Sequence, residues 1–348
     1  KGVFSDCENT NKNDGSLASR LIFGIKEGIQ MGENFFREET RVIHRMGTTI
    51  TLQVAHNDPM WLLSELERLL HEYETRFSAN DPHSELMAVN HAAGQHPVVV
   101  DPELYELIKI GKYHSCAEDS HLNIAIGPLV QRWRIGFTDA KVLTPSEVAA
   151  LLPLTDPQQI RLNEEEQSVF LEKQGMLLDL GSLAKGYIAD KLRMYCHQNH
   201  AVYALINLGG NIVTYGASPK HQDGFWRIGI RDPQGTRQQS LEIIKVKNAS
   251  LVTSGIYERY LQQGASVYHH IIDPKTGFPT KSDLASLTIV SKSSLEGEIW
   301  TTRLFGKPIV QVVDQLKAQT GIEGILVTRE NRVCHTSGIK ENYFGKEE

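Results

Sequence analysis

The chain has 348 residues, of which 40% are hydrophobic and 22% are charged, which is typical of a globular protein with one large domain or two closely packed lobes. The formal charge of −6 provides no basic stripe for phosphate contacts, so nucleic acid is excluded as an expected partner. No run of about 18 apolar residues predicts a membrane span. The four cysteines are far apart and lack a CxxC pair, so neither a zinc ribbon nor a disulfide framework is indicated.

The N-terminal segment is predicted to lie outside the folded domain. Residues 1–18 are polar and rich in Asn, Asp, Lys and Ser, a composition that does not favour a packed core. The following residues, 20–35, predict a short helix. We therefore divide the chain into a tail or linker over 1–35 and one folded domain over 36–348.

The first half of the domain combines a strand with prominent helices. Organised structure becomes clear at Arg41, after which apolar residues alternate to one side, as in a half-buried strand, at Ile50, Leu52 and Val54. The Asp-Pro pairs at 58–59 and 101–102 each supply an N-cap and a first-turn proline for a helix. Thr144 and Glu147 predict a capping box before a third helix.

The second half has a different pattern, in which short β-like runs are separated by Gly, Pro, Asn or Asp. Helices are predicted at about 183–198, 295–305 and 308–319. The chain therefore belongs to the α+β class, with neither a Rossmann alternation nor an internal repeat. The β-like runs are "QIRL", "SVFLE", "YALINL", "FWRIGI", "LEIIKVK", "SVYHHII" and "SLTIVS".

Two glycine turns are candidates for ligand contact. Residues 177–192 pass from an apolar strand through a turn into a helix with Lys185 near its start, where free N–H groups and a lysine would face an anion. An ordinary strand-to-helix turn explains this pattern equally well. Gly209, Gly210 and Asn211 follow another apolar strand, and here a tight turn between two strands is the favoured interpretation.

Two further stretches carry side chains suited to catalysis or metal binding. His269 and His270 are neighbours on a predicted strand, so they point to opposite faces and one at most serves a given site; we choose His270. Glu298 and Thr302 are four residues apart, which places a carboxylate and a hydroxyl on one helix face. Such oxygen ligands suit magnesium, although spacing alone favours an ordinary solvated helix face.

Taken together and in this order, the motifs resemble those of the ApbE-type FAD:protein FMN transferases. The resemblance extends from Arg41 to the C-terminus, and several motifs in order are far more specific than any one of them. The motifs are "MGT" at Met46, "SEL" and Asn90 within 84–90, "IGPLVQRW" at 126–133, "DLGSLAKGYIAD", "INLGGN", "TSGIYER", "HHIIDPKTGFP" and the helix with Glu298 and Thr302.

The resemblance implies a fold and an activity. The fold is an ApbE-like (T-fold-like) mixed α/β core of two intimate lobes, with a flavin groove between them. In that groove FAD binds with Mg²⁺ on its diphosphate, and a Thr or Ser hydroxyl of an acceptor flavoprotein displaces AMP to form protein-linked FMN. Because the acceptor brings the nucleophile, the chain needs no catalytic triad, and its work is positioning and charge neutralisation.

The resemblance also assigns roles to individual residues. The backbone carbonyl of Ser182 and the side chains of Glu298 and Thr302 would hold the metal. Lys185 would offset diphosphate charge, and His270 would assist proton transfer from the acceptor hydroxyl. The positions at which family members contact FAD or line its groove are Met46, Asn80, Asn123, Asp179, Lys185, His270 and Ile272.

Three positions depart from the family pattern. Ser182 replaces the usual second glycine after "DLG", which matters little if only its carbonyl is used. Glu298 and Asn123 stand where aspartate is usual; the extra methylene of Glu298 would shift the metal by up to about a bond length. These changes put the catalytic rate in question and leave the fold unaffected.

Two alternative functions remain open. Water could replace the acceptor hydroxyl, which would make the chain an FAD diphosphatase, and Asn80 stands at a groove position that varies within the family and is often tyrosine. A non-catalytic FAD-binding protein is the other alternative, but the retained Lys185, His270 and Thr302 argue against it. Redox catalysis is disfavoured because there is no dinucleotide-binding fingerprint.

The resemblance suggests an extracytoplasmic protein, lipid-anchored to a bacterial membrane after removal of a leader, with the cytoplasm as the alternative. Cys7, in "VFSDC", lacks a convincing lipobox. The chain contains no "SGAT"-like flavinylation sequence, so a separate acceptor protein is expected.

Overall fold

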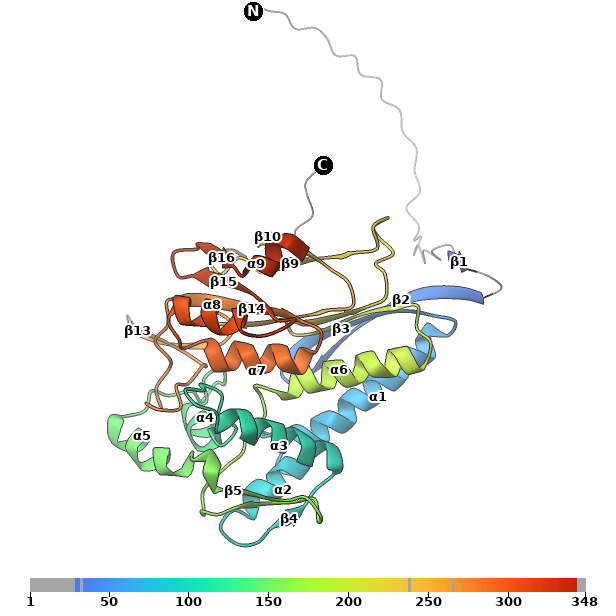
Figure 1. The fold of residues 1–348 in the computed structure, drawn as a ribbon. Coiled ribbons are helices and arrows are strands. Elements are labelled where there is room, and N and C mark those ends of the chain that lie inside the picture. Colours follow the sequence, from blue (N-terminus) through green and yellow to red (C-terminus); the bar gives the residue numbers. More distant parts are fainter. Residues whose placement is uncertain (1–28, 32–33, 237–238, 265, 343–348) are drawn as a thin grey trace, which may run out of the picture.

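The computed structural model describes residues 29–31, 34–236, 239–264 and 266–342, and the ribbon in Figure 1 shows their arrangement. Its centre is an antiparallel sheet with nine strands in the described part of the chain, in the order β1-β2-β3-β7-β8-β11-β14-β15-β16. These strands are β1 (Ile29–Met31), β2 (Asn34–Arg45), β3 (Thr48–His56), β7 (Tyr203–Leu208), β8 (Asn211–Tyr215), β11 (Ser250–Gly255), β14 (Leu284–Ser291), β15 (Glu323–Thr328) and β16 (Val333–His335).

The start of the sheet corrects one sequence prediction. The described residues between 29 and 35 lie in the strands β1 and β2 and not in a helix, and organised structure begins before Arg41. Residues 20–28 of the predicted helix, and the predicted tail at 1–18, lie outside the described residues. The physical reason is strand pairing: β1 pairs with β2 from Ile29↔Phe36 to Met31↔Asn34, and β2 then pairs with β3 from Arg37↔His56 onward. These ladders decide the backbone conformation of a polar segment that has no strand pattern of its own.

Helices cover one face of the sheet, as Figure 1 shows for α1 (Pro59–Phe77), α6 (Ala184–Gln198), α7 (Ser294–Leu304) and α8 (Ile309–Lys317). The predicted alternation in β3 is confirmed, because Ile50, Leu52 and Val54 are fully buried beneath these helices. The opposite face carries the hairpin of β9 (Trp226–Arg231) and β10 (Ser240–Val246) together with α9 (Ser337–Asn342). Trp226, Ile244 and Ile339 form part of a second apolar cluster there.

A smaller lobe contains the remaining elements. It consists of α2 (Glu85–His91), α3 (Pro102–Ser115), α4 (Gly127–Trp133), α5 (Pro145–Leu151), two short 3₁₀ helices (Leu152–Leu154 and Pro157–Gln159) and a sheet in the order β4-β6-β5, formed by Val98–Val99, Ser168–Leu171 and Ile160–Asn163. A separate hairpin joins β12 (Tyr260–Gln263) to β13 (Ser266–His269).

The helix starts and the later elements agree with the sequence predictions. The side chain of Asp58 accepts a hydrogen bond from the Trp61 N–H, and Asp101 accepts one from the Glu103 N–H. Both bonds of the predicted capping box at Thr144 are present. The predicted helices near 183–198, 295–305 and 308–319 are α6, α7 and α8.

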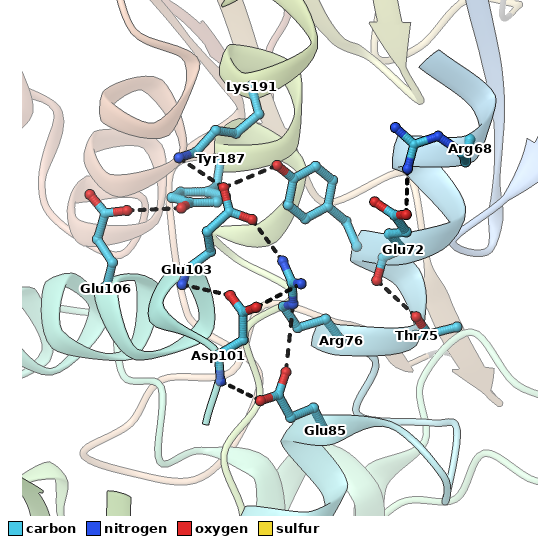
Figure 2. Close-up of polar contacts among 11 residues, drawn as sticks. Arg68, Glu72, Thr75, Arg76, Glu85, Asp101, Glu103, Glu106, Tyr187 and Lys191 are labelled. Atoms are coloured by element: carbon cyan, nitrogen blue, oxygen red, sulfur yellow. Dashed lines mark hydrogen bonds and ion pairs between the residues drawn. The ribbon is translucent and has the colours of Figure 1, made fainter. Parts of the chain in front are cut away.

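The two lobes share one core. Leu66 of α1, Leu104 of α3 and Ile188 of α6 all belong to the largest apolar cluster. Beside it, Arg76 of α1 forms ion pairs with Glu103 at 2.7 Å, with Asp101 at 2.9 Å and with Glu85 at 3.6 Å, so that α1, α2 and α3 are joined by one guanidinium (Figure 2). Among the described residues, no helix is long and apolar enough to cross a membrane.

Candidate active site

The site begins where α6 and α7 approach each other closely. At Gly186, a Cβ atom would lie 2.6 Å from the carbonyl oxygen of Ser294 and 2.7 Å from Cγ of Glu298. Only glycine permits this approach, because a larger residue would collide with the backbone of α7. The close packing brings the first turn of α6, which carries Lys185, to the side of Glu298.

Glu298 is a buried carboxylate, with only 4% of its surface exposed. Its Oε1 lies 3.3 Å from Nζ of Lys185 and accepts a hydrogen bond from Nδ2 of Asn211 at 3.0 Å. Both contacts are made by Oε1, and Oε2 receives no hydrogen bond from any residue that the structure describes. Lys185 also donates to the carbonyl of Gly181 at 3.4 Å. The structure therefore brings together two residues that the sequence predicted for different roles.

The other two predicted metal ligands, Ser182 and Thr302, are half-buried. Thr302 lies one helical turn after Glu298, and within the described part of the chain its hydroxyl makes no hydrogen bond. Its neighbour Thr301 instead donates back to the carbonyl of Glu298 at 3.1 Å. No group of three or more His, Cys, Asp or Glu side chains in the described residues could hold a metal ion. A cation at this place would need hydroxyl and carbonyl oxygens in addition to one carboxylate, which is the predicted donor set.

Asp179 lies at the entrance to the turn before α6. Its N–H donates to the carbonyl of Ile124 at 2.8 Å, and its Oδ1 accepts from the Gly181 N–H at 2.8 Å. Burial raises the pKa of this carboxyl, while the Gly181 N–H and the positive charges of Arg259 and Lys185 oppose the rise. Asp179 is therefore within electrostatic reach of Lys185.

His270 follows β13 and faces the same region. Both its N–H and its Nδ1 lie 3.2 Å from the carbonyl of Arg259. Burial lowers the pKa of His270 to about 4, and the charges of Arg259 and Lys185 act in the same direction. The side chain nevertheless keeps partial solvent exposure. His269, in contrast, is buried, and its Nε2 lies 2.9 Å from the carbonyl oxygen of Thr280. The two neighbouring rings therefore contact different segments of the chain.

Sequence reasoning did not single out Arg259, which the structure places at a junction of segments. A Cβ at Gly136 would lie 2.9 Å from Cδ of Arg259, and a Cβ at Gly47 would lie 3.7 Å from its guanidinium nitrogen. The side chain therefore lies between the turn that follows β2 and the loop that follows α4. Gly47 and Gly136 have positive φ angles of 66° and 97°, a conformation that favours glycine. In the sequence they are two isolated glycines, and nothing there relates them to Arg259.

Asn211 is a second residue whose contact with the site could not be predicted from the sequence. The tight turn predicted at Gly209 and Gly210 is confirmed: it joins β7 to β8, and the two φ angles are 69° and 98°. The turn delivers the side chain of Asn211 to Glu298, which is 87 residues away in the sequence. No local pattern contains that contact.

Met46 lies in a turn and Ile272 lies in an apolar cluster. Met46 occupies the β2–β3 turn with φ 51°, and its N–H donates to Oε1 of Glu74 at 2.8 Å. Ile272 is buried in an apolar cluster with Trp133, whose indole N–H donates to the carbonyl of Gly277 at 2.9 Å. This bond ties the turn that follows His270 to α4.

The structure does not bring Asn80 and Asn123 into one cavity. Asn80 is exposed at a cavity of about 460 Å³ that also contains Gln131 and Leu178 in its lining. Asn123 lines a separate cavity of about 320 Å³. Its amide donates to the carbonyl of Thr155 at 2.8 Å and accepts from the Ala125 N–H at 2.8 Å, so both polar atoms are already bonded within the chain.

Lys185 and Glu298 form an ion pair near His270, which is neutral at neutral pH. Oε2 of Glu298 and the Thr302 hydroxyl have no hydrogen-bond partner among the described residues. This arrangement is suited to binding a phosphate group and neutralising its charge. The chain belongs to the ApbE family, whose family model matches residues 46–326. It is 41% identical over 292 residues to an FAD:protein FMN transferase of Klebsiella pneumoniae (strain 342), covering 84% of this chain and 90% of that protein. It is 34% identical over 318 residues to an FAD:protein FMN transferase of Treponema pallidum (strain Nichols), covering 87% and 88%.

Solved structures agree with this assignment. The ApbE protein of Thermotoga maritima superposes with a TM-score of 0.81 at 25% identity, covering 89% of this chain and 100% of the other. The flavin transferase ApbE of Vibrio cholerae gives a TM-score of 0.76 at 25% identity, covering 88% and 99%. The expected ApbE-like fold is confirmed.

Proposed function

We infer that this chain is an FAD:protein FMN transferase, as its relatives in the ApbE family are named. The acceptor hydroxyl oxygen forms a bond to the phosphorus of the FMN half of FAD, the bond from that phosphorus to the AMP oxygen breaks, and AMP leaves. The hydroxyl proton must be accepted by a base. The observation that carries this inference is the Lys185–Glu298 pair at the close α6–α7 junction, in a chain whose family is established.

We propose that magnesium is held by the carbonyl of Ser182 and the side chains of Glu298 and Thr302. Three oxygen donors suit this ion, which keeps several waters and is completed by substrate phosphates. Support comes from Oε2 of Glu298 and the Thr302 hydroxyl, which have no hydrogen-bond partner among the described residues. When bound, magnesium would supply neutralisation of charge on the diphosphate.

Two side chains have proposed roles in catalysis. His270 is neutral at pH 7, because its pKa lies near 4, and a neutral imidazole is able to accept the proton of the acceptor hydroxyl. Lys185 offsets negative charge on the FAD diphosphate, and its ammonium group is already held near the start of α6 by Glu298 and Gly181. The flavin contacts predicted for Met46, Asn80, Asn123, Asp179 and Ile272 remain part of this proposal.

The acceptor protein and the cellular location are two further parts of the proposal. We propose that the acceptor is a flavoprotein that presents a Thr or Ser within a flavinylation motif. We also propose that the full-length protein is extracytoplasmic and lipid-anchored at a membrane; recovery of the native protein in the cytoplasmic fraction of its source cell would contradict this location.

The deciding experiment incubates the protein with FAD and Mg²⁺, with and without an acceptor that carries the motif, and follows AMP release and the acceptor mass. AMP together with an FMN-sized mass gain on the acceptor supports the transferase. AMP with free FMN only would favour an FAD diphosphatase. Bound FAD without AMP in either condition would leave a flavin-binding protein. Glu298→Ala and EDTA should each abolish turnover if the metal proposal is right.

A further inference from the structure

A buried chain of hydrogen bonds ends on the carboxylate of Glu298. The Ser294 hydroxyl donates to Oδ1 of Asn211 at 2.6 Å, and Nδ2 of Asn211 donates to Oε1 of Glu298 at 3.0 Å. The exposed fractions of Ser294, Asn211 and Glu298 are 0%, 3% and 4%, so water does not compete for these bonds. Satisfied polar chains of this kind hold side chains in one arrangement.

The carboxylate of Glu298 fixes the orientation of the Asn211 amide. Because a carboxylate only accepts hydrogen bonds, the amide NH₂ group is the one that points to Glu298, and the amide oxygen accepts from the Ser294 hydroxyl. The opposite amide orientation would place two acceptor oxygens against each other in a buried position. Asn211 is thereby a donor to Glu298, and it shares Oε1 with the ammonium group of Lys185 at 3.3 Å.

A glutamate needs such support more than an aspartate would, because it has one more rotatable bond between backbone and carboxylate. The absence of a side chain at Gly186 leaves room for Cγ of Glu298, and Asn211 and Lys185 then hold one of the two oxygens. The other oxygen, Oε2, is left for a cation. Carboxylates that bind metals are commonly oriented by such hydrogen bonds from a second layer of residues.

We propose that Asn211 and Ser294 are positioning residues for the metal site: they fix the Glu298 carboxylate so that Oε2 faces the cation. This inference rests on the proposed function, since it takes Glu298 to be a magnesium ligand. Neither residue touches FAD or the acceptor in this role. Their effect is therefore expected on metal affinity and not on the binding of flavin.

The test compares Asn211→Leu with wild type by titrating Mn²⁺ alone and following the free ion by electron paramagnetic resonance. We expect Mn²⁺ affinity to fall about 10- to 100-fold, as for other residues that orient metal ligands. The Mg²⁺ concentration for half-maximal AMP release should rise by a similar factor, while FAD affinity in EDTA, read from flavin fluorescence, changes less than about 2-fold.

The matched control is Asn207→Ala. Asn207 belongs to the same hairpin and accepts from the Gly210 N–H at 2.8 Å, but it does not contact Glu298, so Mn²⁺ affinity should stay at the wild-type value. If Asn211→Leu does not fold, Ser294→Ala removes only the hydroxyl at the far end of the chain and should weaken Mn²⁺ binding by a smaller factor in the same direction.

The proposal would be overturned if Asn211→Leu and Ser294→Ala bound Mn²⁺ with the same affinity as wild type. A wild type that binds no Mn²⁺ would also overturn it. Failure of the proposed function has a different signature. A wild type that binds Mn²⁺ but never releases AMP rejects the transferase, whereas the comparison of Asn211→Leu with Asn207→Ala still decides the role of Asn211.

Discussion

Asn123 stands where the ApbE pattern normally has aspartate, and its surroundings account for the amide. It donates to the buried carbonyl of Thr155 and accepts from the N–H of Ala125. An aspartate keeps the second bond but is not able to donate the first, so it would leave the Thr155 carbonyl unsatisfied beside a buried charge. The amide therefore has a structural role in this chain.

Asn123→Asp is accordingly expected to lower the free energy of unfolding by about 1–3 kcal/mol, the penalty for leaving a buried group unpaired. Urea denaturation measures this change. Asn163→Asp is the matched control, because the side chain of Asn163 accepts from the N–H groups of Glu165 and Glu166 and donates no hydrogen bond to any described residue, so stability should change little. Equal effects of the two substitutions would reject this explanation of Asn123.

His270 provides the second prediction at this scale. His270→Ala should lower the rate of acceptor flavinylation at saturating FAD by about 10²- to 10⁴-fold, the usual contribution of a general base. Because burial lowers the pKa of His270 to about 4, the base is neutral at neutral pH, and the wild-type rate should fall only as the pH drops toward that value. An inflection near the ordinary histidine pKa of 6.5 in the kcat/KM profile would contradict the assignment.

At the scale of elements, Arg76 joins its own helix, α1, to α2 and α3 through the carboxylates of Glu85, Asp101 and Glu103, as Figure 2 shows. Its side chain is 22% exposed, so the pairs are screened less than pairs at an open surface. Lys191 of α6 adds a further ion pair to Glu103 at 3.0 Å. This network holds the smaller lobe against α1 and α6, and hence against the helix that carries Lys185.

Arg76→Met should lower the free energy of unfolding by about 1–3 kcal/mol, because the three carboxylates would repel one another without it. Thermal melts at low and at high salt measure the change, which should shrink at high salt as the repulsion is screened. Arg68→Met on the same helix is the control. Arg68 forms ion pairs with Glu65 and Glu72 at the surface, and its replacement should have little effect. An equal loss in both variants would show that the Arg76 network has no special role.

At the scale of the whole molecule, several partly buried histidines make stability depend on pH. Burial lowers the pKa of His114 and of His270 to about 4, and it also lowers the pKa of His269. In the unfolded chain these groups titrate near 6.5. Between the two values the unfolded state binds more protons, so the free energy of unfolding falls as the pH drops through this window.

The apo protein should therefore melt at a lower temperature at pH 5 than at pH 7, with a slope of up to about 1.4 kcal/mol per pH unit for each histidine. Differential scanning calorimetry across this range measures the slope. His114→Gln, which keeps an acceptor near Arg303 but does not titrate, should reduce it. Identical melting temperatures at the two pH values would show that these histidines titrate normally in the fold.

The sequence by itself determined the helix starts at Asp58, Asp101 and Thr144, about half of the described strands, the turn at Gly209 and, through ordered motifs, the family. These features depend on residues that are neighbours in the chain, where capping, periodicity and turn chemistry act. The helix predicted over 20–35 failed in its described part because the pairing of β1 with β2, which continues into the ladder with β3, decides the conformation of that polar segment. Local propensity is weak against such a ladder.

Only the tertiary structure decided how the candidate site is assembled. The bond from Asn211 to Glu298 spans 87 residues, and the approach of α6 to α7 at Gly186 depends on two helices that are about a hundred residues apart in the sequence. The side chain of Arg259 reaches its place only when the β2–β3 turn and the loop after α4 are both packed. Contacts between distant segments leave no local period or cap, so they exist only once the common core has brought the elements together.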